Sequence, residues 1–192
     1  RSGFSRKVTA DEYVASVEND TITDLLSDYS VKPGDVFFLP AGRIHSIGAG
    51  SFIAEIQQTS DITYRIYDFN RRDANGNTRQ LHTELAKDAI SYDVLPDYRT
   101  RYEERENHEV RLVSCPYFTT SLYVLTESYT IDLSALDSFV VLIAMEGRAS
   151  ITDDAGNTVD VHQGETVLLP AVTGRVDIVP EGRFKMLASH ID

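Results

Sequence analysis

Three side chains in one short stretch of the sequence, His45, Glu55 and Arg65, are of types that can move protons or stabilise charge. An imidazole can bind a metal, a carboxylate can transfer a proton, and a guanidinium can stabilise developing negative charge. Glu55 and Arg65 are ten residues apart, in two segments with strand-like alternation that are joined by a turn at residues 59–61. If those strands pair, the two side chains converge on one pocket, but spacing alone leaves a plain surface ion pair equally open.

The surroundings of these residues also leave two readings open. Alternation in residues 51–57 separates an apolar face from a mostly polar face that carries Glu55. A sandwich would turn the polar face to water, whereas a ligand-holding barrel turns polar side chains inward. His45 follows a Pro-Ala-Gly turn and, taken alone, is more often structural than a ligand. The other histidines lack metal-ligand spacing and are interpreted as surface or local structural residues: His82, His108, His162 and His190.

Short helices and many short strands must position these residues. Thr9 and Glu12 predict a capped helix from residue 10, followed by a further helical turn around Leu25 and Leu26. A third helix is expected at residues 81–90, with Leu81, Leu85, Ala89 and Ile90 on one face. Short β-branched and aromatic runs between Gly, Pro, Asn and Asp turns predict strands, at 36–40, 46–50, 52–58 and 63–69 and then repeatedly from 110 onward.

An internal repeat links the two β-rich regions. Residues 34–41, GDVFFLPA, match residues 164–171, GETVLLPA, at a constant separation of 130 residues. Extending that register places Arg175 opposite His45. Because arginine stays protonated and does not ligate metals, the two copies are expected to share a scaffold and not a site.

Composition narrows the classes of partner. The 192 residues contain 18 Lys and Arg against 30 Asp and Glu, a net charge of −12, without a clustered basic run. This balance argues against nucleic acid or an anionic membrane as a partner. No apolar stretch reaches the roughly 20 residues that a membrane span needs, so a soluble protein is expected. The single cysteine, Cys115, cannot form an internal disulfide, which suits a reducing, cytoplasmic compartment.

The stretch around the three candidate residues resembles a known family. Residues 40–50, PAGRIHSIGAG, and residues 54–68, AEIQQTSDITYRIYD, are similar to type I mannose-6-phosphate isomerases over a long, nearly ungapped signature. Residues 31–35 and the degenerate second copy add to the resemblance. It implies a mainly β fold of cupin-type jelly-roll barrels, the first one incomplete, with a few short helices. The expected parts are a metal-binding barrel region at 1–95, a linker at 96–109 and a second, non-catalytic cupin-like domain at 110–192.

The resemblance also implies roles for individual residues. His45 falls on a zinc ligand of the family, Arg65 and Glu55 on catalytic positions, and Arg71 on a contact to the substrate phosphate. The implied reaction interconverts mannose 6-phosphate and fructose 6-phosphate through an enediol, with one zinc ion per full-length chain.

The resemblance breaks down ahead of residue 31. Nothing there supplies the remaining zinc ligands, so the upstream strands of the first barrel are expected to be missing. The chain alone is then expected to be inactive, and its unpaired barrel edges favour homo-oligomers or strand exchange. The alternative is a catalytically dead cupin that acts as a sugar-binding or oligomerisation module.

Overall fold

The computed structural model describes residues 1–60 and 62–191, and the chain divides into two compact units, Arg1–Arg99 and Thr100–Asp192. None of the helices in the described part of the chain is both long and apolar enough to cross a membrane.

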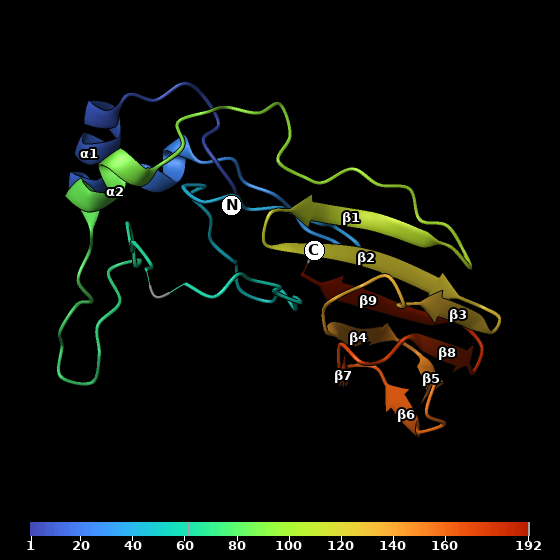
Figure 1. Cartoon of the computed structure of the whole chain (residues 1–192). Helices are drawn as coiled ribbons and strands as arrows, with labels where there is room; N and C mark the ends of the chain where they lie inside the picture. Colours follow the sequence, from blue (N-terminus) through green and yellow to red (C-terminus); the bar gives the residue numbers. More distant parts are fainter. Residues whose placement is uncertain (61, 192) are drawn as a thin grey trace. The chain divides into compact units, whose positions relative to one another are not determined.

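The first unit has a small helical core. Helix α1 (Ala10–Glu18) and helix α2 (Thr83–Ala89) lie side by side, and the 3-10 helix η1 (Ile22–Leu25) follows α1 (Figure 1). The buried apolar side chains of this core are Phe4, Val8, Tyr13, Val17, Ile22, Ile44 and Ala86. Burial of these side chains is what holds the two helices to the segment that carries Ile44.

The predicted helices are present, α2 is shorter than the predicted 81–90, and α1 begins where its sequence signals indicate. The Thr9 hydroxyl accepts the Glu12 backbone N–H at 3.1 Å, and the Glu12 carboxylate accepts the Thr9 N–H at 2.9 Å, which completes the predicted capping box. The predicted inner face of α2 is wrong. Leu85 is 61% exposed, and Ala86 is the residue that this helix buries, so the helix meets the core one position later than the apolar spacing indicated.

The predicted strands of the first unit do not form. Residues 36–40, 46–50, 52–58 and 63–69 are irregular where described, and Phe52 is 91% exposed. The β-pairing found among the described residues of this unit consists of isolated bridges, Ser2 with His45, Phe4 with Leu26 and Arg72 with Thr78. A strand is defined by a ladder to a neighbour, and the described residues offer these segments no such partner. The expected turn at 59–61 includes Asp61, which lies outside the described residues.

The second unit is a pair of packed antiparallel sheets (Figure 1). One sheet has the strand order β1-β2-β9-β4-β7 and the other has the order β3-β8-β5-β6. The strands are β1 (Glu109–Cys115), β2 (Phe118–Leu125), β3 (Tyr129–Asp132), β4 (Val140–Glu146), β5 (Arg148–Asp153), β6 (Thr158–His162), β7 (Thr166–Leu169), β8 (Arg175–Pro180) and β9 (Phe184–His190). They lie in the β-rich region predicted from residue 110 onward, with β1 beginning one residue earlier, and the mainly β, jelly-roll expectation is confirmed.

Apolar side chains fill the space between the two sheets. The buried cluster joins residues of both, among them Leu142 and Phe184 from the first sheet and Ile151 and Ile178 from the second. Around Leu142, Ile151 and Phe184 no space remains that a water molecule could occupy. Around these side chains the interior of this unit is therefore a packed apolar core.

The two copies of the sequence repeat form the same turn. Asp35 accepts the Lys32 backbone N–H through its carboxylate at 3.2 Å, and Glu165 accepts that of His162 in the same way at 2.8 Å. The intervening Gly34 and Gly164 have φ values of 90° and 89°, which glycine adopts without strain. After the second copy the chain enters β7, whereas after the first copy no strand follows. A shared turn is thus retained in two different surroundings.

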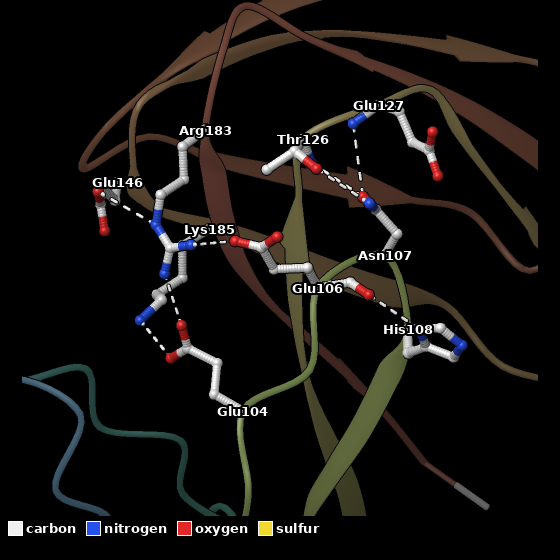
Figure 2. A network of polar contacts seen from close by, with 9 residues as sticks. All are labelled: Glu104, Glu106, Asn107, His108, Thr126, Glu127, Glu146, Arg183 and Lys185. Carbon is white, nitrogen blue, oxygen red and sulfur yellow. Dashed lines mark hydrogen bonds and ion pairs between the residues drawn. The ribbon is translucent and has the colours of Figure 1, made fainter.

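A polar network fastens the start of the second unit to β9 (Figure 2). The Glu104 carboxylate accepts hydrogen bonds from Arg183 Nη2 and, at 2.7 Å, from Lys185 Nζ. These cations hold the pKa of Glu104 below its usual value, the Lys185 ammonium first. Asn107 continues the attachment, because its backbone N–H donates to the Val124 carbonyl oxygen of β2 at 2.7 Å.

Loss of this carboxylate should weaken the second unit only slightly. Replacing Glu104→Gln is expected to lower the unfolding free energy by about 1 kcal/mol or less, because partly exposed ion pairs contribute little. Urea unfolding at low and high salt measures the change, and the wild-type advantage should shrink as salt rises. Glu103→Gln is the control, since Glu103 is 82% exposed. Equal effects of the two substitutions at both salt concentrations would contradict the role given to Glu104.

Candidate functional site

His45 lies on a short extended segment held against the start of the chain. The Gly3 N–H donates to the Ile44 carbonyl oxygen at 2.8 Å, and the Ser46 N–H donates to that of Arg1 at 3.1 Å. Ile44 is buried in the core of the first unit, so alternation turns the neighbouring His45 outward, where it is exposed. Its Nδ1 is 3.0 Å from the Arg43 carbonyl oxygen.

Arg65 is held through its backbone by a histidine that the sequence analysis set aside. The Arg65 N–H donates to His82 Nδ1 at 3.0 Å, and the His82 N–H donates to the Arg65 carbonyl oxygen at 2.8 Å. The ring of Tyr64 lies 6.0 Å from that of His82. His82 is therefore a local structural residue, as predicted, and the residue that it positions is Arg65, whose side chain is half-buried.

Glu55 is exposed in an irregular segment. The expected pairing of residues 52–58 with residues 63–69 is absent from the described part of the chain, and no ion pair there joins Glu55 to Arg65. The structure thus does not bring the Glu55 and Arg65 side chains into contact.

Arg71 belongs to a cluster around a buried carboxylate. Its Nη2 donates to Asp68 Oδ1 at 2.7 Å, and Arg79 binds the same carboxylate in a bidentate manner, with Nε to Oδ2 at 2.8 Å and Nη2 to Oδ1 at 2.6 Å. The Asp68 side chain is 7% exposed, whereas both arginines are largely exposed. Sequence analysis assigned Arg71 a role but missed Asp68 and Arg79.

These contacts make the first unit sensitive to acid. The Arg79 guanidinium, followed by that of Arg71, lowers the pKa of Asp68 to about 2. An unfolded aspartate titrates near pH 3.9, so the unfolded chain binds the proton first and the folded state loses stability as pH falls from about 4 towards 2.

Asp68→Asn should remove this component of the pH dependence. We expect the difference in unfolding free energy between wild type and this variant to be largest above about pH 4 and to decrease as the pH approaches 2. Denaturant unfolding followed between pH 2 and 6 measures it. Asp88→Asn is the control, since Asp88 is an exposed aspartate on α2 of the same unit. A difference in unfolding free energy that stays constant down to pH 2 would contradict the lowered pKa of Asp68.

The described residues fit a metal ion only in part. The contact of His45 Nδ1 with a backbone carbonyl is the arrangement that leaves the other ring nitrogen free to ligate. Zinc needs three or four protein ligands, and in the described part of the chain no three His, Cys, Asp or Glu side chains are grouped to hold an ion. His45 is thus a single candidate ligand, and these residues do not hold zinc by themselves.

Comparison with known proteins relates the chain to one family. Residues 108–191 match the family model described as mannose-6-phosphate isomerase, cupin domain. The chain is 32% identical over 186 residues to mannose-6-phosphate isomerase ManA of Bacillus subtilis, covering 95% of this chain and 57% of that protein. It is also 32% identical over 167 residues to mannose-6-phosphate isomerase of Streptococcus mutans, covering 86% of this chain and 51% of that protein.

The fold agrees with these matches. A crystal structure of the Bacillus subtilis mannose 6-phosphate isomerase superposes with a TM-score of 0.82 at 27% identity, covering 99% of this chain and 59% of that one. The chain spans little more than half the length of these relatives. The resemblance inferred from residues 31–68 is confirmed by matches that extend over nearly the whole chain. Residues 108–191 thus match the cupin domain of the mannose-6-phosphate isomerase family, and the chain as a whole is similar to these isomerases over nearly its full length.

Proposed function

We propose that a protein carrying this sequence interconverts mannose 6-phosphate and fructose 6-phosphate. The observation that carries the proposal is the match to curated mannose-6-phosphate isomerases over 95% of the chain, which includes the segment with His45, Glu55 and Arg65. The proposed substrate is therefore a phosphorylated hexose, and the proposed compartment is the cytoplasm.

The reaction assigns one task to each candidate residue. Isomerisation moves a proton from C2 to C1 through an enediol, while the carbonyl passes from C1 to C2. The Glu55 carboxylate takes the proton and returns it, and the Arg65 guanidinium stabilises the negative charge that develops on the sugar oxygen. Arg71 binds the phosphate, which fixes the position of the reacting carbons.

Positioning of these groups follows from the contacts of the first unit. His82 fixes the Arg65 backbone from both sides, so the guanidinium extends from a defined point. Glu55 makes no contact with Arg65 in this structure. The proposed mechanism therefore requires residues 52–58 to move, so that Glu55 and Arg65 face the same substrate. We propose that contact with the substrate, or with residues of a longer protein, orders this segment.

Zinc enters the proposal through His45. When bound, zinc would polarise the substrate carbonyl. Because no three potential ligand side chains are grouped among the described residues, we expect other residues to complete the site and the chain alone to be inactive.

A coupled assay tests the function directly. A protein of the relatives' length that carries this sequence should convert mannose 6-phosphate, and Glu55→Gln should reduce kcat by about 100-fold or more, since proton transfer by a positioned side chain contributes about 10²–10⁴-fold. Exposed Glu127 on the second unit provides the control substitution to glutamine. Absence of turnover in the unmodified protein, or full activity of Glu55→Gln, would overturn the proposal.

The second candidate function is a catalytically dead cupin that binds sugar or drives oligomerisation. The packed apolar interior of the second unit favours a purely structural role for that unit. Analytical ultracentrifugation together with the assay separates the two functions, because an inactive protein that assembles into defined oligomers supports the second.

A further inference from the structure

Asp68 binds two arginines, Arg71 and Arg79, through its side-chain carboxylate. Its Oδ1 accepts from Nη2 of both Arg71 and Arg79, at 2.7 Å and 2.6 Å, and its Oδ2 accepts from Arg79 Nε at 2.8 Å. One carboxylate oxygen shared by two guanidinium groups places these two cations next to each other. Without that carboxylate, two positive charges at such a separation would repel each other.

An unusual backbone turn brings Arg71 back to Asp68. Phe69 and Asn70 both have positive φ, 54° and 51°, and the Arg71 N–H donates to the Asp68 carbonyl oxygen at 3.1 Å. A bulky residue such as Phe69 rarely adopts this conformation, so the surrounding structure has to enforce it. The turn also lets Arg71 Nε donate to the Asp68 carbonyl oxygen at 3.3 Å.

A second turn returns Arg79 to the same place. The Asp73 carboxylate accepts the N–H groups of Asn75 and Asn77, at 2.8 Å and 2.9 Å, and the turn is closed by the bridge between Arg72 and Thr78. Two consecutive turns thus converge on Asp68.

The outward edges of the two guanidinium groups remain available. In the described part of the chain, the bonds of both arginines to Asp68 use Nε and Nη2, and neither Nη1 has a partner there. The Arg71 and Arg79 side chains are 64% and 53% exposed, while Asp68 is buried beneath them. The surface of the cluster is therefore cationic, with one net positive charge, and offers a pair of planar donors of the kind that phosphate accepts.

We propose that Asp68 is a positioning residue and that Arg79 joins Arg71 in binding the phosphate group of a sugar phosphate. The proposal deepens the proposed function and rests on it for the identity of the sugar. A phosphate monoester carries close to two negative charges at neutral pH, more than the cluster can neutralise through Arg71 alone. Asp68 holds both guanidinium groups in place before the ligand arrives, which reduces the entropy lost on binding.

Calorimetric titration with inorganic phosphate and with mannose 6-phosphate tests the pair. Arg79→Gln is expected to weaken the binding of both ligands about tenfold, as the loss of a charge-assisted contact predicts. Arg79→Lys should recover part of the affinity, because it keeps the charge and loses the planar fork. Arg6→Gln is the matched control, since Arg6 is an equally exposed arginine of the first unit, paired with Glu12.

Asp68→Asn examines the positioning role separately. It should weaken phosphate binding while both arginines remain, and a thermal unfolding curve shows whether the variant is folded. If Asp68→Asn does not fold, Arg79→Gln and Arg79→Lys still decide the matter. Wild-type phosphate affinity in Arg79→Gln would overturn the proposal.

Failure of this proposal can be told apart from failure of the isomerase function. Phosphate binding can be measured without turnover. If an inactive protein binds inorganic phosphate in a way that depends on Arg79, phosphate binding by Arg71 and Arg79 is supported and the isomerase function is contradicted. If Arg79→Gln turns over mannose 6-phosphate with an unchanged KM, the isomerase function is supported and the role of Arg79 in phosphate binding is contradicted.

Discussion

Replacing Phe184 by alanine is expected to lower the unfolding free energy of the second unit by about 3–5 kcal/mol. Phe184 is 1% exposed and pairs with Leu125 of β2, inside the cluster that joins the two sheets. The substitution removes a ring from a region with no space for even one water molecule, so the loss of transfer energy adds to the cost of a new cavity. Denaturant unfolding followed by circular dichroism measures the difference.

Phe139→Ala is the matched control for this experiment. Phe139 is 41% exposed, and the same deletion there should cost about 1 kcal/mol or less, because most of the ring already meets water. Equal effects of the two substitutions would contradict the placement of Phe184 in a tightly packed core between the sheets.

Replacing Arg65 by alanine should produce a large loss of activity. In a protein of the relatives' length, we expect kcat/KM for mannose 6-phosphate to fall by about 100-fold to 1,000-fold, the usual cost of one group that stabilises developing charge. Stability should change little, because His82 holds Arg65 through backbone groups that the substitution retains. The coupled assay and a thermal unfolding curve of the same preparation check both statements.

Arg175→Ala is the control for Arg65. Arg175 occupies the position opposite His45 in the sequence repeat and makes a surface ion pair with Asp177 at 3.3 Å. Its removal should leave kcat and KM unchanged. A comparable loss of activity in both variants would show that removal of any arginine impairs the enzyme, and the role given to Arg65 would fall.

The second unit could be predicted from the sequence because its signals are local and agree with one another. A continuous apolar run marks β4, and the Asp-Ala-Gly-Asn turn at residues 154–157 separates β5 from β6. Each strand also finds a partner within the same unit, so the local preference is fulfilled by a ladder.

Residues 36–69 carry the same local signals without that outcome. Phe52 and Tyr64 belong to runs with strand-like composition, yet both are exposed and neither segment has a ladder among the described residues. Strand composition reports that a side chain suits a sheet, and it contains no information on whether a neighbouring strand is present. Pairing of Glu55 with Arg65 could therefore not be derived from their spacing.

The cluster at Asp68 was missed for a related reason. Arg71 was assigned through the family signature alone, whereas contact between Asp68 and Arg79 depends on two turns between them. The Asn-Gly pair at residues 75–76 is a recognised turn signal and indicates that Arg79 returns towards Asp68. The preceding turn has no such signal, because Phe69 is not a residue that favours positive φ.

Zinc content and turnover, measured together, test the central claim most directly. The same preparation is analysed for bound metal and assayed with mannose 6-phosphate, for this chain and for a protein of the relatives' length that carries it. We predict stoichiometric zinc and turnover in the longer protein, and neither in this chain, since its described residues contain no group of three potential zinc ligands. A longer protein that is folded and loaded with zinc, yet leaves mannose 6-phosphate unchanged, would contradict the isomerase function.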